Sequence, residues 1–103
     1  MTLAGHSASG TCAVEGAELL GSTVSQASIC EAFASAMQRT APGLNYSVQV
    51  KIESKSRMSA RLVVEGRTLP VQNLAVSDGP IRVSSIERFA AGVAESATRN
   101  RAR

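Results

Sequence analysis

Two neighbouring runs of alternating apolar and polar residues constrain the fold of this 103-residue chain more than any other feature. In residues 45–54, NYSVQVKIES, the even positions from Tyr46 to Ile52 are apolar and the odd positions are polar or charged. Residues 58–64 repeat the pattern, with apolar side chains at the even positions from Met58 to Val64. Such alternation predicts two strands with one buried face each. Both apolar sets have even numbers, so directly paired residues must sum to an even number, as Ile52 and Met58 do.

The residues after this hairpin predict a further strand. Glu65-Gly66 suits a two-residue turn, because glycine accepts a positive φ, and this turn would pair Val64 with Arg67. The pairing would turn two more apolar side chains inward, Leu69 and Val71.

The end of the third strand needs an irregularity. Leu74 and Val76 are apolar and have even numbers, whereas the inward-facing Leu69 and Val71 have odd numbers. A bulge near Gln72 or Asn73 would turn both apolar sets toward the core. Pro70 cannot donate to a strand ladder, so we expect its nitrogen to face an unpaired edge.

Two segments carry the helical period. The first opens with Ser28 and Glu31, an S-x-x-E capping box, although a start near Ser25 fits as well. Its stripe of apolar or small residues comprises Ile29, Phe33, Ala36, Met37 and Thr40. The second opens with a capping box from Ser84 to Glu87. Its stripe comprises Ile86, Phe89, Ala90, Val93, Ala94 and Ala97.

The element order is (β)αβββα if residues 11–14, TCAV, form a short strand. An antiparallel sheet of three to four strands with two helices on one face would bury every apolar stripe. We therefore predict a two-layer α+β domain over residues 11–98. Residues 1–10 are expected to be a flexible lead-in and residues 99–103 a basic tail.

The two cysteines of the chain, Cys12 and Cys30, would fasten the first strand to the first helix if they were bonded. A bridge that closes a loop of about eighteen residues stabilises a domain by roughly 3 kcal/mol. Cysteine pairs in small domains indicate an oxidising compartment, so this disulfide predicts an exported protein. Two alternatives stay open. Both residues would be buried free thiols in a cytosolic protein, or Cys30 at a helix N-terminus would be a reactive thiolate.

The layout C…SxxCEAF…APGLxYxVxV…GRxLPxQ…ERFA resembles small exported proteins of unknown function from GC-rich bacteria. The resemblance spans residues 11–95 and implies a periplasmic or secreted location, without any characterised activity. The opening residues MTLAGHSASG lack the basic and apolar regions of a signal peptide. We therefore expect either a mature exported domain whose leader was replaced by Met1, or a cytoplasmic protein.

The formal net charge of +3 points only weakly to nucleic acid. Three of the basic residues lie in the last five positions, RNRAR, and the rest of the chain is neutral. The αβββα order matches that of double-stranded-RNA-binding domains, which makes nucleic-acid binding the alternative function. Its contacts would be Arg82, Arg88, Arg99, Arg101 and Arg103. Fold order alone, however, is an argument by analogy.

Signatures of catalysis and of cofactor binding are missing from the sequence. His6, the only histidine, lies in the expected lead-in, and two separated cysteines make at most half a zinc site. Glu15 and Glu18 are expected to be solvated loop carboxylates, and Met37 and Met58 core residues rather than copper ligands. No apolar run reaches the roughly 20 residues of a membrane helix. We expect no cofactor, no metal and no enzymatic activity.

A protein-binding or accessory module is the remaining interpretation. The polar face of the predicted sheet offers an interaction surface to an unknown protein partner. We name Gln49, Lys51, Arg61 and Val63 as its candidate residues.

Overall fold

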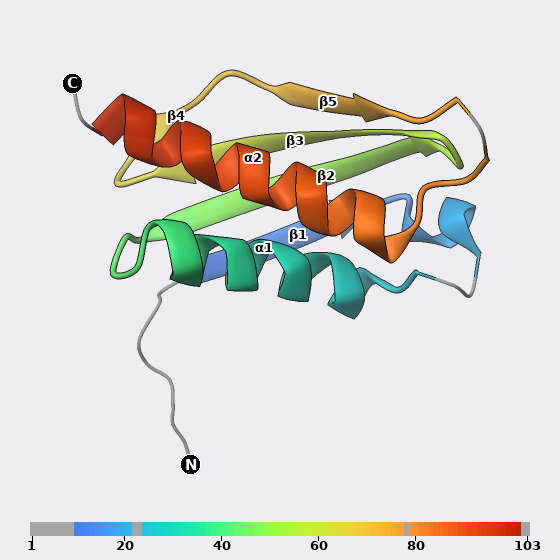
Figure 1. Cartoon of the computed structure of the whole chain (residues 1–103), viewed down its shortest axis with the longest axis horizontal. Helices are drawn as coiled ribbons and strands as arrows, with labels where there is room; N and C mark the ends of the chain where they lie inside the picture. Colours follow the sequence, from blue (N-terminus) through green and yellow to red (C-terminus); the bar gives the residue numbers. More distant parts are fainter. Residues whose placement is uncertain (1–9, 22–23, 78, 102–103) are drawn as a thin grey trace, which may run out of the picture.

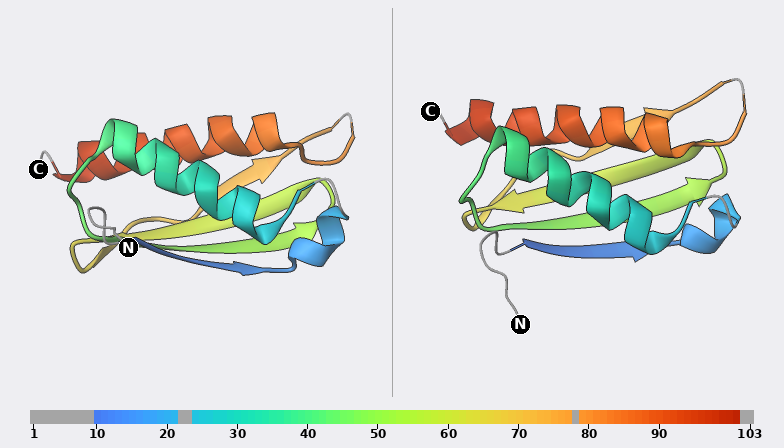
Figure 2. Two further views of the ribbon diagram at one scale, coloured as in Figure 1. Left: turned by 90° about the horizontal axis from the view of Figure 1, so that it is seen from below. Right: turned by 60° about the horizontal axis from the view of Figure 1, so that its bottom comes forward.

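The chain is an α+β domain with two α-helices and a five-stranded sheet. The computed structural model describes residues 10–21, 24–77 and 79–101, with only the backbone for residues 100 and 101. Both α-helices lie on the same side of the sheet (Figures 1 and 2). The elements in chain order are β1 (Gly10–Glu15), the 3-10 helix η2 (Ala17–Leu20), α1 (Gln26–Thr40), β2 (Tyr46–Ser54), β3 (Arg57–Val64), β4 (Arg67–Thr68), β5 (Gln72–Ala75) and α2 (Val83–Arg101).

The β2–β3 hairpin has the register that the alternation predicts. Ile52 pairs with Met58 and Val50 with Ala60, and these side chains are at most 3% exposed. Because side chains alternate across a strand, this register places the even-numbered residues 46–52 and 58–64 under the helices, up to the register shift between Ile52 and Ser54. The odd-numbered residues point to the other side of the sheet.

The expectation of an antiparallel sheet with three to four strands is confirmed only in part. The sheet has five strands, and β1 pairs with β2 in parallel, with Cys12 beside Val48 and Val14 beside Val50. Parallel neighbours need a crossover connection of roughly a dozen residues or more, and α1 with its loops provides it. The strand β1 therefore lies at one edge of the sheet, under α1 (Figure 2).

The predicted turn at Glu65-Gly66 is confirmed. Both residues have positive φ, 51° and 82°, and Val64 pairs with Arg67. The Glu65 carboxylate also accepts a hydrogen bond of 2.8 Å from the backbone N–H of Asn45. This contact joins the turn to the start of β2.

Beyond the turn, the predicted course of the chain is wrong in one respect. Leu69 is buried, as expected, whereas Val71 is 46% exposed. The ladder breaks after β4, where Pro70 offers no donor, rather than through a bulge at Gln72 or Asn73. β5 then pairs with β3, and Leu74 lies opposite Met58 and packs against the core.

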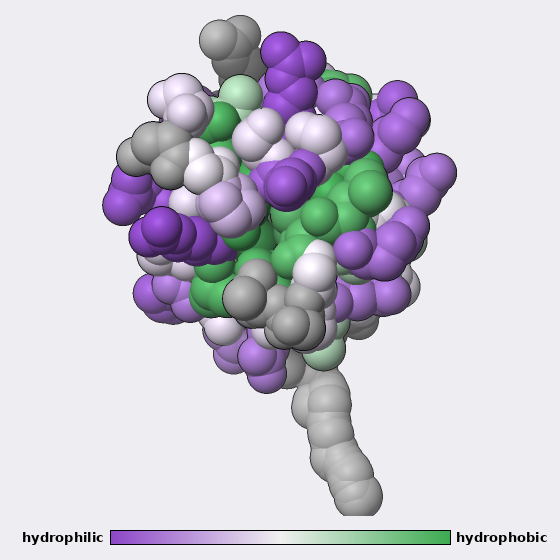
Figure 3. Space-filling model, turned by 90° about the vertical axis from the view of Figure 1, so that its right-hand side faces the viewer, coloured by the Kyte–Doolittle hydropathy of each residue, from purple (hydrophilic) through white to green (hydrophobic). Residues whose placement is uncertain are grey.

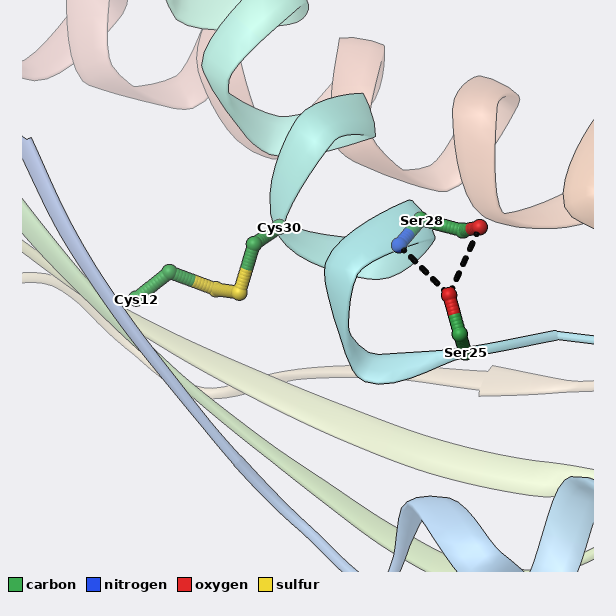
Figure 4. The surroundings of a disulfide bond; sticks show 4 residues. All are labelled: Cys12, Ser25, Ser28 and Cys30. Carbon is green, nitrogen blue, oxygen red and sulfur yellow. Dashed lines mark hydrogen bonds between the residues drawn. A yellow bond between two sulfur atoms is a disulfide. The ribbon is translucent and has the colours of Figure 1, made fainter.

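The helix α1 begins earlier than its capping box predicts. Ser25 is the N-cap, and its hydroxyl accepts a hydrogen bond of 3.1 Å from the backbone N–H of Ser28 (Figure 4). Ser28 therefore lies inside the first turn, and the proposed box from Ser28 to Glu31 is wrong. The alternative start near Ser25 is confirmed. The predicted apolar stripe is buried at Ile29, Phe33, Ala36 and Met37.

The helix α2 begins at Val83, so Ser84 lies in its first turn and the second predicted capping box is also wrong. Its stripe packs on the sheet and on α1, where Phe89 meets Phe33 edge to face with ring centroids 6.2 Å apart. α2 continues to Arg101, so residues 99–101 belong to this helix. The buried residues of the stripe are Ile86, Ala90, Val93, Ala94 and Ala97.

Candidate interaction face

The disulfide joins Cys12 of β1 to Cys30 of α1, with Cα atoms 5.7 Å apart (Figure 4). The predicted pairing is confirmed, and neither cysteine is a free thiol. Both residues are half-buried at the contact between the helix layer and the edge of the sheet. The bond therefore fixes the edge strand β1 to the helix that crosses above it.

The side of the sheet turned away from α1 and α2 is covered by no element in the part of the chain that the structure describes (Figure 2). We call this surface the open face. It is formed by residues of all five strands: Thr11, Ala13 and Glu15 of β1, Ser47, Gln49, Lys51 and Glu53 of β2, Arg57, Ser59, Arg61 and Val63 of β3, Thr68 of β4, and Asn73 and Ala75 of β5.

The candidate residues from the sequence lie together on the open face. Gln49 lies directly opposite Arg61, and the next pair along the hairpin on this face is Lys51 with Ser59. Lys51 and Arg61 are therefore diagonal neighbours on adjacent strands. Gln49, Lys51 and Arg61 are exposed, whereas Val63 is half-buried.

A shallow hollow of about 430 Å³ lies on this face. Polar residues of three strands, β1, β2 and β3, line it together with four apolar residues. Its lining comprises Ala13, Val14, Glu15, Gln49, Val50, Lys51, Ser59, Arg61 and Val71.

The two cations of the hollow lack an ion-pair partner among the described residues. Within residues 10–21, 24–77 and 79–99, neither Lys51 nor Arg61 has an ion pair or a side-chain hydrogen bond. Glu15 lies beside Lys51 in the β1–β2 register but forms no ion pair with it. Both cationic groups are therefore available to an incoming ligand.

The arginines proposed for nucleic-acid binding do not gather in one place. Arg88 and Arg99 are exposed on α2 and lie about 16 Å apart along its axis. Arg99 is 3.8 Å from Glu95, which offsets its charge. Arg82 is exposed just before the helix, the backbone of Arg101 lies in its last turn, and Arg103 is outside the described residues.

Sequence reasoning missed two parts of the hollow. Ala13 and Glu15 belong to β1, whose partner strand was not predicted. The helix between β1 and β2 is the signal that could have placed them, because a helical crossover joins parallel neighbours. Val71 was expected in the core, but the break at Pro70 turns it out to the rim.

The remaining candidate groups lie elsewhere. Glu15 and Glu18 are both exposed, and Met37 and Met58 are buried in the core. Among the described residues, no cluster of three or more histidine, cysteine, aspartate or glutamate side chains could hold a metal ion. Over the same residues, neither helix has both the length and the apolar character needed to cross a bilayer. His6 lies outside the described residues.

A second hollow of about 690 Å³ lies on the outer surface of the helix layer. Its lining mixes small side chains with charges of both signs: Ser28, Glu31, Ala32, Ala34, Ser35, Gln38, Arg39, Val83 and Glu87.

Comparisons with protein-family models, with curated proteins and with solved structures found no match to this chain.

Proposed function

We propose that this chain is an exported, non-enzymatic binding module that holds a protein partner against its open face. One observation carries the proposal. The sheet packs one side against the helices, and its other side presents Lys51 and Arg61 in a hollow with Gln49 and Ser59, without an ion pair among the described residues. Long cationic side chains with polar neighbours on adjacent strands can hold a partner through charge-assisted hydrogen bonds.

The disulfide supports an extracytoplasmic location. Disulfides persist in the periplasm and outside the cell, whereas cytosolic reductants keep most thiols reduced. The bond between Cys12 and Cys30 holds a strand whose own side chains are at most half-buried. A domain that needs such a bond to keep its edge in place benefits from an oxidising compartment.

The composition of the open face fits a reversible protein interface. Such interfaces are about as apolar as the remaining protein surface, and arginine is enriched in them. Arg61 lies near the centre of the face, between Gln49 and Ser59, with Val63 farther along the same strand. The exposed Val71 adds apolar contact at the rim.

Photo-crosslinking from matched positions tests the proposed surface. A photoreactive residue in place of Gln49 reports on the open face, and the same residue in place of Gln38 reports on the helix layer. In the native host we expect one discrete protein adduct from position 49 that Arg61→Ala abolishes. Adducts from position 38 alone, or an adduct insensitive to Arg61→Ala, would contradict the proposed surface.

Nucleic-acid binding is the second candidate function. The arrangement that favours it is the β2–β3–β5 antiparallel stretch with both helices on one side, in the αβββα order (Figure 1). Filter binding of duplex RNA over a salt series distinguishes the two functions, because phosphate contacts weaken steeply with salt. Salt-dependent retention that Arg82→Gln and Arg88→Gln remove would favour this candidate, and no retention at low salt would eliminate it.

A further inference from the structure

We infer that the partner presents an extended acidic segment, with two carboxylate side chains two residues apart that meet Arg61 and Lys51. This inference rests on the proposed function and names the chemistry of the partner. It follows from the spacing of the two cations, from the hollow between them and from the carboxylates at its border.

The spacing of the two cations matches an extended chain. Diagonal neighbours on adjacent antiparallel strands are about 7–8 Å apart. In an extended strand, side chains on one face recur every two residues, about 6.6 Å apart. Glutamate or aspartate at alternate positions of a partner strand can therefore reach Lys51 and Arg61 at the same time.

The chemistry of the hollow suits carboxylates. The arginine guanidinium presents paired donors that match a carboxylate bidentately, whereas lysine acts as a compact point charge. Gln49 and Ser59 lie opposite these two cations and add hydrogen-bonding groups at the same level of the sheet. Val71 and Ala13 provide the apolar contact for the residues between and beside the two carboxylates.

The border of the hollow limits how acidic the segment can be. Glu15 lines the hollow beside Lys51, and Glu53 lies on the same face two residues further along β2. A long polyanion such as a nucleic-acid backbone would be repelled by these groups. We therefore expect two carboxylates to be followed by neutral or basic side chains at this end of the hollow.

NMR titration of the oxidised, isotope-labelled chain tests the inference. The probe is a short synthetic peptide of serines with two glutamates two residues apart, and its matched control replaces both glutamates by glutamine. We expect saturable shifts of backbone amides in β2 and β3 around Gln49–Lys51 and Ser59–Arg61 with the glutamate peptide only. Raising the salt concentration should weaken the binding, because the contacts are charge-assisted.

Charge-removing variants locate the contacts. Arg61→Gln and Lys51→Gln should each weaken binding of the glutamate peptide by roughly tenfold. Arg39→Gln on α1 and Arg88→Gln on α2 are matched controls on the helix layer and should leave it unchanged. All four side chains are exposed, so the variants are expected to fold, which amide spectra will verify.

The outcomes separate the inference from the function on which it rests. No saturable shift with the glutamate peptide, equal binding of the glutamine peptide, or shifts confined to α1 and α2 would each overturn the acidic segment. Tighter binding of duplex RNA at the same amides would overturn it in favour of phosphate. If crosslinking from position 49 still gives an adduct sensitive to Arg61→Ala, the binding module stands with a partner of other chemistry.

Discussion

At the scale of single residues, Gly16 shows how closely the edge of the sheet is packed. It has a φ of 85°, and a Cβ there would lie 2.5 Å from the carbonyl oxygen of Ile52. We predict that Gly16→Ala lowers the free energy of unfolding by roughly 2–3 kcal/mol, through backbone strain and this overlap. Urea denaturation measures the loss.

Gly66 provides the matched control for this substitution. It also has a positive φ, 82°, in the turn after β3, but a Cβ there would meet no atom within 4 Å. Gly66→Ala should therefore lose only the backbone contribution, about 1 kcal/mol. Equal losses at the two positions would show that the contact with Ile52 has no energetic weight.

Tyr46 is the only tyrosine of the chain and is 8% exposed. Burial raises the pKa of its phenol above the ordinary value of about 10, because desolvation disfavours the phenolate. The unfolded chain ionises first, so folding stability should fall as the pH rises from about 10 through the folded-state pKa. An ultraviolet titration of phenolate absorbance should give a higher midpoint in the native than in the denatured protein, and coincident midpoints would contradict the burial.

At the scale of elements, the disulfide supports β1 more than the rest of the sheet. We predict that the double variant Cys12→Ala, Cys30→Ala is less stable by roughly 3 kcal/mol, because its unfolded state is no longer restricted. Hydrogen exchange should accelerate far more at the β1 amides than in the β2–β3 hairpin. Uniform acceleration over the whole sheet would mean that β1 does not depend on this bond.

The side chain of Ser96 links α2 to β5. Its hydroxyl accepts a hydrogen bond of 2.9 Å from the Gln72 amide and donates one of 2.6 Å to the Val93 carbonyl. Ser96→Ala should cost about 1 kcal/mol in thermal or urea unfolding, because it removes the acceptor of a half-buried amide. Thr98→Ala is the control, since the Thr98 hydroxyl donates a hydrogen bond to the exposed Glu95 carbonyl of its own helix. If Thr98→Ala lowers the free energy of unfolding as much as Ser96→Ala does, the bond between α2 and β5 has no special weight.

The elements differ in how far the sequence predicts them. The β2–β3 register follows from local parity, because a shift by one residue would expose Ile52 or Met58. The parallel pairing of β1 is a long-range contact that TCAV alone does not encode. Both helix starts were misplaced because Ser28 and Ser84 match a capping pattern but lie inside the first turn of their helices. α1 is capped by the side chain of Ser25, and α2 begins at Val83.

At the scale of the whole molecule, the two layers leave one side of the sheet exposed. The smallest extent of the chain is 19 Å, which a sheet and one helix layer fill. The end of the molecule seen in Figure 3 shows hydrophobic surface among hydrophilic groups. Leu19 of η2 and Val83 of α2 are exposed apolar side chains. The cations Lys51 and Arg61 lie on the open face.

The sequence predicts the central residues of the open face but not the residues at its edges. Gln49, Lys51 and Arg61 were predicted from the alternation of β2 and β3, which fixes the outward side of each residue. Glu15 and Val71 reach the hollow through the crossover and through the break at Pro70, which depend on tertiary packing. The chemistry of the partner can be inferred only once the positions of Glu15 and Val71 at the edge of the hollow are known.

The thiol state of the protein in its native cells tests the central claim most directly. Cells are quenched with acid, and free thiols are alkylated without reductant. The intact mass of the protein is then measured before and after reduction and a second alkylation. An exported domain with the Cys12–Cys30 bond should carry no alkyl group before reduction and two afterwards. Two alkylated thiols before reduction would contradict both the exported location and the disulfide on which the position of β1 depends.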